Sequence, residues 1–384
     1  MLYLDHNATT AMAPEVLEVF LGAAKQAFAN PSSSHAAGQA ARRAMDQARA
    51  QVAGLIGAQP PEIVFTGGGT EANNLAILGL AEALSAQGAA GHIITSAVEH
   101  HAVLRPCRRL AANGFTLTEL PVDAQGQVAI ATFVAALRPD TRMVSLMLAN
   151  NEVGTIQPVA EIARICAERR IWLHCDAVQA VGKIPIDVQE LGVDLLSLSG
   201  HKFHGPKGVG ALYVKENTPL QPVLTGGSQE RRLRPGTENV PGIAALGAAA
   251  ALAAQDLNAS FAHQLNLRSH FERHLQEAIP DAVIHGLGAT RLPNTTSVRF
   301  PGIKAGALLI ELDLRDVAVS AGAACATANP EPSHVLVAMG LSPEEARATL
   351  RFSAGREHQL ADMDRAVALL SQALSALRQR RETQ

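Results

Sequence analysis

The chain is predicted to be an α/β protein in which a mostly parallel sheet is wrapped by helices. Short apolar runs of strand length alternate with helical stretches between residues 62 and 199. Polar residues follow most of these runs, as they do at the carboxyl ends of strands in an open parallel sheet. A chain of 384 residues, 47% of them hydrophobic, can bury more than one core, so two domains are expected.

The N-terminal half supplies the elements of the large domain. Residues 1–13 are predicted to form an arm, and two alanine-rich amphipathic helices are expected at 14–28 and 36–56, separated by the polar breaker 30–34. Six strands are then predicted, at 62–66, 92–95, 115–120, 143–148, 171–175 and 194–199.

The alternation of strand-length apolar runs with helical stretches ends after residue 225. A helix is predicted at 238–254, and an α+β region begins near residue 259. Its expected elements are strands at 296–299, 317–320 and 349–353 and a closing helix at 359–378. The predicted domains are therefore an arm at 1–13, a large domain at 14–258 and a small domain at 259–384.

Composition argues against several classes of protein. A formal net charge of −3 and an aromatic content of 3% provide neither a basic surface nor stacking side chains for nucleic acid. The N-terminus lacks the features of a signal peptide, and the longest weakly polar run, 242–254, is too short to cross a membrane. We therefore expect a soluble, cytoplasmic protein without a nucleic-acid or membrane partner.

The cysteines indicate a reduced compartment. Cys107, Cys166, Cys175 and Cys325 show no CxxC spacing and are few for a chain of this length. We predict no disulfide framework and no metal site.

Lys202 stands directly after the last predicted strand of the large domain, in a turn rich in glycine. From these residues alone, a solvated lysine in a turn is as good an interpretation as a reactive amine. A lysine that forms an imine needs a pocket that desolvates its ammonium group and lowers its pKa. Ser199, His201 and His204 are suitable neighbours for such a pocket.

Three other strand ends carry complementary chemistry. The run GGGT at 67–70 precedes a helix predicted to begin near Ala72, which makes it an anion cradle or simply a tight turn. Asp176 follows an apolar strand and needs a cationic or N–H partner. His100 either caps a helix or covers a planar ring. Together with Lys202, these groups match the needs of pyridoxal phosphate (PLP): an imine former, a pyridinium partner, a phosphate anchor and a ring support.

Motifs along nearly the whole chain resemble those of class I cysteine desulfurases. They are YLDHNATT (3–10), NPSSSH (30–35), FTGGGTEANNLAI (65–77), EHHAVL (99–104), NNEVGTIQP (150–158), HCDAVQAVGK (174–183), SGHKFHGPKGVGALYV (199–214), RPGTEN (234–239) and LRFSAGR (350–356). The resemblance implies a fold type I PLP-dependent transferase, a homodimer, and conversion of L-cysteine to L-alanine with sulfur passed to an enzyme cysteine.

The resemblance also implies roles for individual residues. Lys202 matches the Schiff-base lysine and the base that takes the Cα proton, Asp176 the pyridine-nitrogen partner, and His100 the stacking histidine and a proton shuttle. The remaining matches are phosphate contacts (Gly69, Thr70, Ser199, His201, and Thr237 toward the other subunit), contacts to cofactor oxygens (Asn151, Gln179), and a substrate-carboxylate contact (Arg351, with Asn151 nearby).

Cys325 matches the cysteine that accepts sulfur. Its segment, 320–327, consists almost entirely of small residues and is expected to form a mobile loop that does not pack a core. Cys107, Cys166 and Cys175 are instead expected to be small buried hydrophobic residues. Delivery of the sulfur to the right geometry should matter more than the thiol pKa.

Other functions remain open at this point. A selenocysteine lyase or an aminotransferase of the same fold would keep Lys202 and Asp176 but need no acceptor cysteine. A catalytically idle sulfur-relay protein and a nucleotide-binding module resting on the GGGT turn are weaker alternatives. The sequence leaves open which protein, such as an iron–sulfur scaffold, would take up the sulfur.

Overall fold

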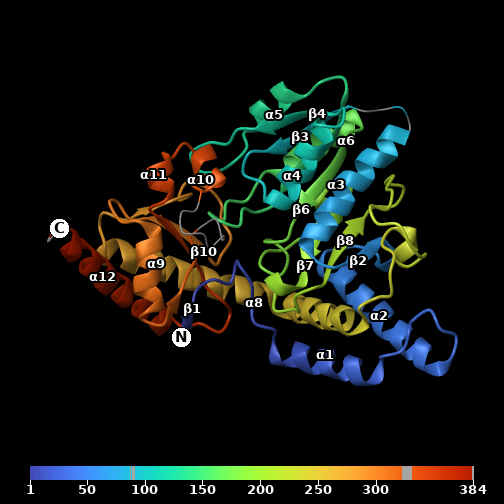
Figure 1. Ribbon diagram of the computed structural model, residues 1–384, viewed down its shortest axis with the longest axis horizontal. Coiled ribbons are helices and arrows are strands. Elements are labelled where there is room, and N and C mark those ends of the chain that lie inside the picture. Colours follow the sequence, from blue (N-terminus) through green and yellow to red (C-terminus); the bar gives the residue numbers. More distant parts are fainter. Residues whose placement is uncertain (87, 89–90, 322–330, 383–384) are drawn as a thin grey trace.

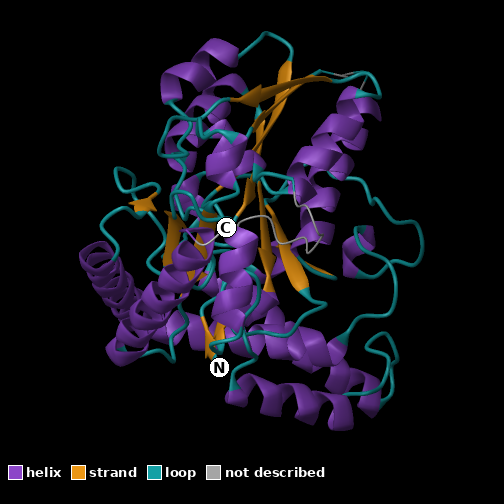
Figure 2. Cartoon of the chain, turned by 60° about the vertical axis from the view of Figure 1, so that its left-hand side comes forward, coloured by secondary structure: helices purple, strands orange, loops and turns teal. Residues whose placement is uncertain are grey.

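The computed structural model describes residues 1–86, 88, 91–321 and 331–382. A large sheet with helices on both faces forms one part of the chain, and a small antiparallel sheet with its own helices forms the other (Figures 1 and 2). Each part has its own buried apolar cluster. The predicted fold class, a mostly parallel sheet wrapped by helices plus a smaller α+β region, is confirmed.

The central sheet has the strand order β2-β8-β7-β6-β5-β3-β4. Its strands are β2 (Ile63–Thr66), β3 (His92–Ser96), β4 (Thr116–Leu120), β5 (Thr141–Met147), β6 (Trp172–Asp176), β7 (Leu195–Ser199) and β8 (Gly210–Val214). The six predicted strands are confirmed, with small shifts at their ends. β8 escaped prediction because it begins within a glycine-rich stretch that reads as a loop.

β8 lies antiparallel between β7 and β2, so β2 points the same way as the parallel strands β7, β6, β5 and β3. The carboxyl ends of all five therefore meet at one edge of the sheet. This direction decides where the functional side chains gather.

Helices cover both faces of this sheet because its strands are apolar on both sides. Val144 and Leu196 belong to the cluster on one face, whereas Met143 and Leu195 belong to the cluster on the other. The first face is covered by α2 (Ala36–Leu55), α5 (Ile130–Ala136), α6 (Val159–Arg169) and α7 (Val188–Leu191), with α1 (Pro14–Gln26) at its margin. The second face is covered by α3 (Gly69–Ala86) and α4 (His101–Ala111).

One long helix connects the two parts. α8 (Val240–Ala278) has 39 residues, so the helix end predicted at residue 254 is wrong. The alanine-rich run ends at residue 254, but no glycine or proline occurs from 255 to 278, and Leu267, Phe271 and Leu275 continue an apolar stripe into the small part. The predicted domain boundary at 258/259 lies inside this helix, which crosses Figure 1 from the small part to α1 and α2.

By length and composition α8 is also apolar enough to span a membrane, but half of the relevant stretch is buried within the protein. Its first half packs against α1 and α2. A buried core helix of a soluble protein has the same composition.

The small part is an antiparallel sheet with helices packed on it. The strand order is β12-β10-β9, formed by β9 (Val283–Ile284), β10 (Thr295–Arg299) and β12 (Thr349–Ser353). The helices packed on it are α9 (Ala305–Asp313) and α12 (Leu360–Glu382). The two short helices α10 (His334–Ala338) and α11 (Pro343–Ala346) bury their apolar residues in a separate cluster with Val98, Met147 and Val153 of the large part. The strands predicted at 296–299 and 349–353 and the closing helix are confirmed, and the strand predicted at 317–320 is shorter, spanning Val317–Ala318 as β11.

The N-terminal arm belongs structurally to the small part. β1 (Leu2–Tyr3) pairs in parallel with β11, and Leu2 and Leu4 lie in the small part's apolar cluster. The arm then turns toward the large sheet. It therefore carries residues 5–9 into the space between the two parts.

Candidate active site

A cavity of about 1330 Å³ opens at the carboxyl ends of β2, β3, β5, β6 and β7. Ten of the predicted site residues line it: Gly69, Thr70, His100, Asn151, Asp176, Gln179, Ser199, His201, Lys202 and Arg351. Two predicted residues are not among them. Thr237 is exposed and does not line the cavity, and Cys325 lies outside the described residues.

Lys202 ends a single 3₁₀ turn (Gly200–Lys202) that directly follows β7. Its Nζ donates hydrogen bonds to the carbonyl oxygens of Asn7 (2.7 Å) and Ala8 (2.8 Å). Burial, reinforced by the positive charge of Arg351, lowers the pKa of this amine to about 8. The desolvated lysine that imine chemistry requires is therefore present.

Asp176 is the last residue of β6 and is 6% exposed. Its Oδ2 accepts a hydrogen bond from Asn73 Nδ2 (2.7 Å), and its Oδ1 accepts one from the backbone N–H of Val178 (3.0 Å). No lysine, arginine or histidine of the described chain forms an ion pair with this carboxylate. A buried carboxylate with only neutral partners favours a cationic ligand.

The glycine turn after β2 provides the close approach that an anion needs. Gly68 has a φ of 145°, which favours glycine, and α3 begins at Gly69, three residues before the predicted start. A Cβ at position 69 would lie 2.7 Å from Cγ2 of Val178. The turn therefore presents bare backbone at the N-terminus of an 18-residue helix, where backbone N–H groups attract phosphate.

His100 satisfies both interpretations of its motif, because it caps α4 and also lines the cavity. Its Nδ1 accepts a hydrogen bond from the backbone N–H of Ala102 (3.0 Å), which leaves the ring hydrogen on Nε2. Desolvation lowers the pKa of His100, although the negative charge of Asp176 opposes that shift. The ring is therefore neutral at physiological pH.

Gln179 and His201, two residues predicted to contact the cofactor, already form hydrogen bonds with other protein groups. Gln179 donates through Nε2 to the carbonyl oxygen of Asn7 (2.8 Å), and its Oε1 accepts from Lys183 Nζ (2.7 Å). One N–H of the Gln179 amide remains for a ligand. His201 contacts Thr9 Oγ1 through Nδ1 (3.1 Å), and burial lowers its pKa to about 4, so it meets a phosphate as a neutral ring.

Arg351 extends from β12 across the gap between the two parts and is 3% exposed. Its Nη1 donates to the carbonyl oxygen of Asn151 (2.9 Å), and its Nη2 donates to Asp5 Oδ1 (2.5 Å). The Nε of Arg351 has no protein partner. A ligand carboxylate therefore meets a guanidinium whose charge Asp5 already balances.

The arm residue Asn7 links both parts to the site, and sequence reasoning did not identify it. Its side chain bonds Thr295 Oγ1 (2.9 Å) and accepts from Lys183 Nζ (3.1 Å), while its carbonyl accepts from Lys202. Lys183 is buried, and desolvation lowers its pKa well below the usual value. The sequence signal for Lys183 was weak: it stands four residues after Gln179.

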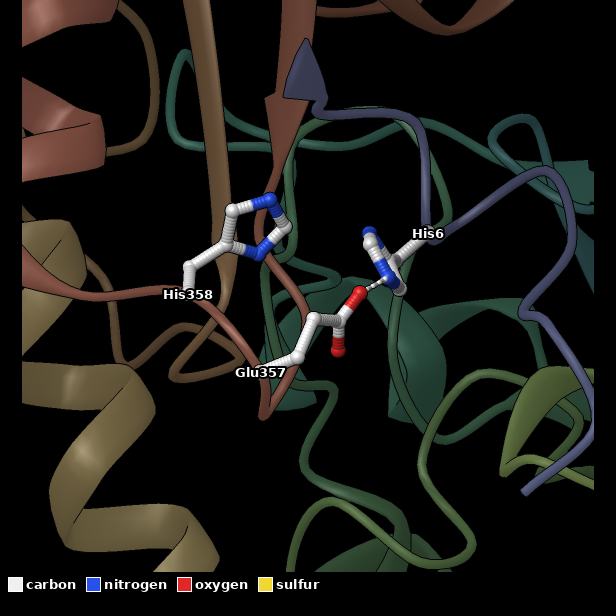
Figure 3. Close-up of side chains that lie close together, drawn as sticks. All are labelled: His6, Glu357 and His358. Atoms are coloured by element: carbon white, nitrogen blue, oxygen red, sulfur yellow. Dashed lines mark hydrogen bonds and ion pairs between the residues drawn. The ribbon is translucent and has the colours of Figure 1, made fainter. Parts of the chain in front are cut away.

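A second contact holds the arm to the small part. His6 Nε2 lies 2.7 Å from Glu357 Oε1, as Figure 3 shows, and His6 Nδ1 lies 3.2 Å from the carbonyl oxygen of Ser353. Desolvation raises the pKa of Glu357, but its interactions with His6 outweigh this effect and lower the pKa to about 2. The arm is therefore held to the small part by the contacts of His6 with Glu357 and Ser353.

Glu99 is an unexpected acid beneath the site. Its side chain is fully buried and accepts hydrogen bonds from Ser96 Oγ (2.7 Å) and the backbone N–H of Met147 (2.9 Å). Burial raises its pKa to about 8, so it is largely protonated at neutral pH. The prediction from the EHH motif concerned its histidine His100 and assigned no role to Glu99.

Cys107, Cys166 and Cys175 are buried free thiols, as predicted. Burial raises the pKa of all three, that of Cys166 to about 12. None is a thiolate nucleophile at neutral pH.

The residues around the cavity fit PLP. Lys202 supplies an amine with a lowered pKa, Asp176 a buried carboxylate without a cationic partner, and the Gly68–Gly69 turn an approach that a side chain would fill. The neutral ring of His100 lies in the wall of the same cavity.

The chain is similar to known proteins over almost its whole length. Residues 2–366 match the family model described as aminotransferase class-V. A cysteine desulfurase IscS of Dictyoglomus turgidum is 46% identical over 377 residues, which cover 98% of this chain and 95% of that protein.

Solved structures are similar as well. A NifS-like protein superposes with a TM-score of 0.91 at 38% identity, covering 97% of this chain and 99% of the other. A structure described as SspA in complex with cysteine has a TM-score of 0.81 at 38% identity, covering 92% of this chain and 98% of the other.

Proposed function

Because the chain belongs to the class-V aminotransferase family, we propose that it is a PLP-dependent cysteine desulfurase that converts L-cysteine to L-alanine. The observation that carries this proposal is the presence in one cavity of an amine with a lowered pKa, Lys202, and a buried carboxylate without a cationic partner, Asp176. The relative described in complex with cysteine supports L-cysteine as the substrate.

Four parts of the site would hold the cofactor. Lys202 would bond it covalently, Asp176 would pair with its pyridinium nitrogen, and His100 would support its ring. Gly69, Thr70, Ser199 and His201, which line the cavity near the start of α3, would hold the phosphate, and Asn151 and Gln179 would contact its oxygens. When bound, PLP acts as an electron sink for the substrate carbons.

Lys202 is also the base of the reaction. At pH 7.5 an amine with a pKa of about 8 is neutral in about a quarter of the molecules, compared with about one in a thousand at the ordinary lysine value of 10.5. Lys202 would be free for this step only after the substrate amine has taken its place, and its neutral Nζ could then take the Cα proton. Arg351 holds the substrate carboxylate and so turns Cα toward that amine.

Cys325 is the proposed sulfur acceptor. Its thiolate attacks the substrate sulfur, forming an S–S bond as the C–S bond breaks, and the electron pair of that bond stays with the substrate carbon. That carbon then takes up a proton to give alanine, and the persulfide remains on Cys325. His100 would serve as the proton shuttle for the substrate thiol, and because its ring hydrogen is on Nε2 it acts first as a donor.

We further propose a homodimer whose partner subunit receives Thr237. Thr237 is exposed and lies outside its own cavity, as a residue that serves a second copy would. Three exposed apolar side chains lie on α1 or just after it: Leu17, Leu21 and Phe28, of which Phe28 is 77% exposed. A partner subunit could bury this apolar surface.

The sulfur would pass from Cys325 to a transient acceptor protein, such as an iron–sulfur scaffold, in the cytoplasm. The names of the relatives support a role in sulfur delivery, and the buried free thiols fit a reduced compartment.

The decisive experiment replaces Cys325 by alanine in the PLP-loaded protein. We expect unchanged PLP absorbance, a fall of alanine release from L-cysteine by orders of magnitude, and loss of the persulfide seen by mass spectrometry after one turnover. Cys107→Ala is the matched control and should retain the rate if its packing is tolerated. Alanine release from L-cysteine at the wild-type rate by Cys325→Ala would contradict the proposal.

Activity on selenocysteine distinguishes a desulfurase from the alternative function, a selenocysteine lyase. A selenol leaves more readily than a thiol, so Cys325→Ala should retain part of any selenocysteine lyase activity. A wild-type protein that acts on selenocysteine but leaves L-cysteine unchanged is a lyase and not a desulfurase.

A further inference from the structure

Two histidines lie on one face of α8, far along the chain from the cavity residues. His270 and His274 are four residues apart, which places them one above the other on a helix. Their ring centroids are 4.0 Å apart with an interplanar angle of 36°. Neither histidine lines the cavity described above.

A carboxylate from the neighbouring helix completes the group. Asp364, in the second turn of α12, places Oδ1 at 2.7 Å from His270 Nε2 and 2.9 Å from His274 Nδ1. The three ligand atoms all lie within 4.8 Å of one another. One oxygen and two ring nitrogens from two packed helices therefore converge on one point.

The side chains around these three ligand atoms leave space for a bound cation. The side chain of Asp364 is 52% exposed and that of His274 is 34% exposed, so water can complete a coordination shell. One nearby group opposes a cation: Arg273 Nη2 lies 3.2 Å from His270 Nδ1. Because that contact makes Nδ1 an acceptor, a metal at Nε2 requires the other tautomer of His270 and the withdrawal of Arg273.

The other histidine cluster, which Figure 3 draws, is not suited to a metal in the same way. Both ring nitrogens of His6 already contact protein acceptors, the carbonyl oxygen of Ser353 and Oε1 of Glu357. His358 Nδ1 accepts the backbone N–H of Gly355 at 3.0 Å. A metal there would have to displace both contacts of the buried His6 ring and a backbone hydrogen bond of the buried His358, whereas His274 and Asp364 of the α8–α12 group are partly exposed.

We propose that His270, His274 and Asp364 form a site for a borderline divalent metal ion such as Zn²⁺. Two imidazoles and one carboxylate suit Zn²⁺, Co²⁺ or Ni²⁺, whereas Ca²⁺ and Mg²⁺ prefer oxygen ligands. The sequence predicted no metal site, because the histidine pair and the aspartate are 90 residues or more apart.

Apart from the withdrawal of Arg273, binding would require only a small movement of the three ligand atoms. Bonds of about 2.05 Å at a tetrahedral angle place ligand atoms about 3.3 Å apart, roughly half an ångström more than the present distances. Asp364 is exposed enough to move back by that amount. The ion would then bridge α8 and α12 and stabilise the small part of the chain.

Zinc titration by calorimetry tests the proposal. The PLP-loaded full chain with Cys325→Ser is used, so that no acceptor thiol competes for the metal. We expect one Zn²⁺ per chain near pH 7.5, with affinity falling roughly tenfold or more in His274→Ala and in Asp364→Asn, and weaker binding near pH 5.5, where imidazoles are protonated. Arg273→Gln should bind Zn²⁺ more tightly, since it removes an opposing charge.

The matched control is His35→Asn, which removes an exposed histidine but retains an N-cap side chain. It should leave zinc affinity unchanged. In a chain that retains Cys325, and without zinc, His274→Ala should release alanine from L-cysteine at the wild-type rate. The proposal is overturned if no zinc binds, or if His274→Ala and Asp364→Asn both bind zinc as tightly as the parent.

Discussion

The guanidinium of Arg351 donates a hydrogen bond to the carboxylate of Asp5 at 2.5 Å, although 346 residues separate the two in the chain. Their side chains are 4% and 19% exposed, so this is a largely desolvated ion pair. It joins the N-terminal arm to β12 at the position proposed for the substrate carboxylate. The substrate must therefore share Arg351 with Asp5 or displace it.

We predict that Asp5→Asn destabilises the protein but increases the rise in melting temperature that added L-alanine causes. Leaving Arg351 without its counter-ion should cost less than the roughly 3–5 kcal/mol found for fully buried pairs, because Asp5 is partly exposed. Added L-alanine supplies a replacement carboxylate, so it should raise the melting temperature more in the variant than in the wild type.

Glu119→Gln is the control for this comparison. It breaks a more exposed pair with Arg108 and should change stability by less than about 1 kcal/mol, with no effect on the alanine response. Equal shifts by L-alanine in Asp5→Asn and wild type would show that Asp5 does not compete for Arg351.

Lys202 should react as an unusually acidic amine in the cofactor-free protein. Its pKa of about 8 predicts half-maximal acetylation near that pH, well below the value near 10.4 of an ordinary lysine. Mass spectrometry of peptides labelled across a pH series measures this directly. A Lys202 profile that rises only above about pH 10 would remove the basis of its proposed role.

The same shift has a consequence for stability. Because the folded pKa is lowered, the unfolded chain binds more protons between about pH 8 and 10.4, and the contribution of Lys202 to stability rises with pH across that window.

Asp176→Asn should weaken retention of PLP by roughly tenfold or more, because a neutral amide cannot balance a buried pyridinium charge. The readout is the absorbance of PLP that remains bound after dialysis. Asp194→Asn is the control: this carboxylate accepts a bond from the backbone N–H of Leu173 and does not line the cavity. Similar losses in both variants would indicate general destabilisation and count against the pairing.

Glu99→Gln should stabilise the protein more at about pH 8 than at about pH 5. Desolvation raises the pKa of Glu99 to about 8, so between about pH 4.5 and 8 the unfolded chain loses a proton that the folded chain retains. Stability therefore falls through that window in the wild type and not in the variant. Thermal melts across the range test this, and a difference independent of pH would contradict the shift.

Local signals in the sequence determined the sheet and half of the site. The strands at 143–148 and 194–199 were predicted because apolar runs of that length have few alternatives, and their parallel direction places the groups at their ends along one edge. Asp176 and Lys202 could be found in this way because each stands at the end of a strand. Sequence reasoning failed at α8, where polar residues on an exposed turn look like a helix end.

The other half of the site is decided by tertiary structure alone. Asn7 lines the cavity, and Asp5 bonds the cavity residue Arg351, because β1 pairs with β11 and so directs the arm between the two parts of the chain. Lys183 reaches the same network through its bonds to Asn7 and Gln179. No periodicity or motif spacing encodes contacts between residues hundreds of positions apart. The lowered pKa of Lys202 and the raised pKa of Glu99 arise in the same way, because desolvation depends on which surfaces the folded chain brings together.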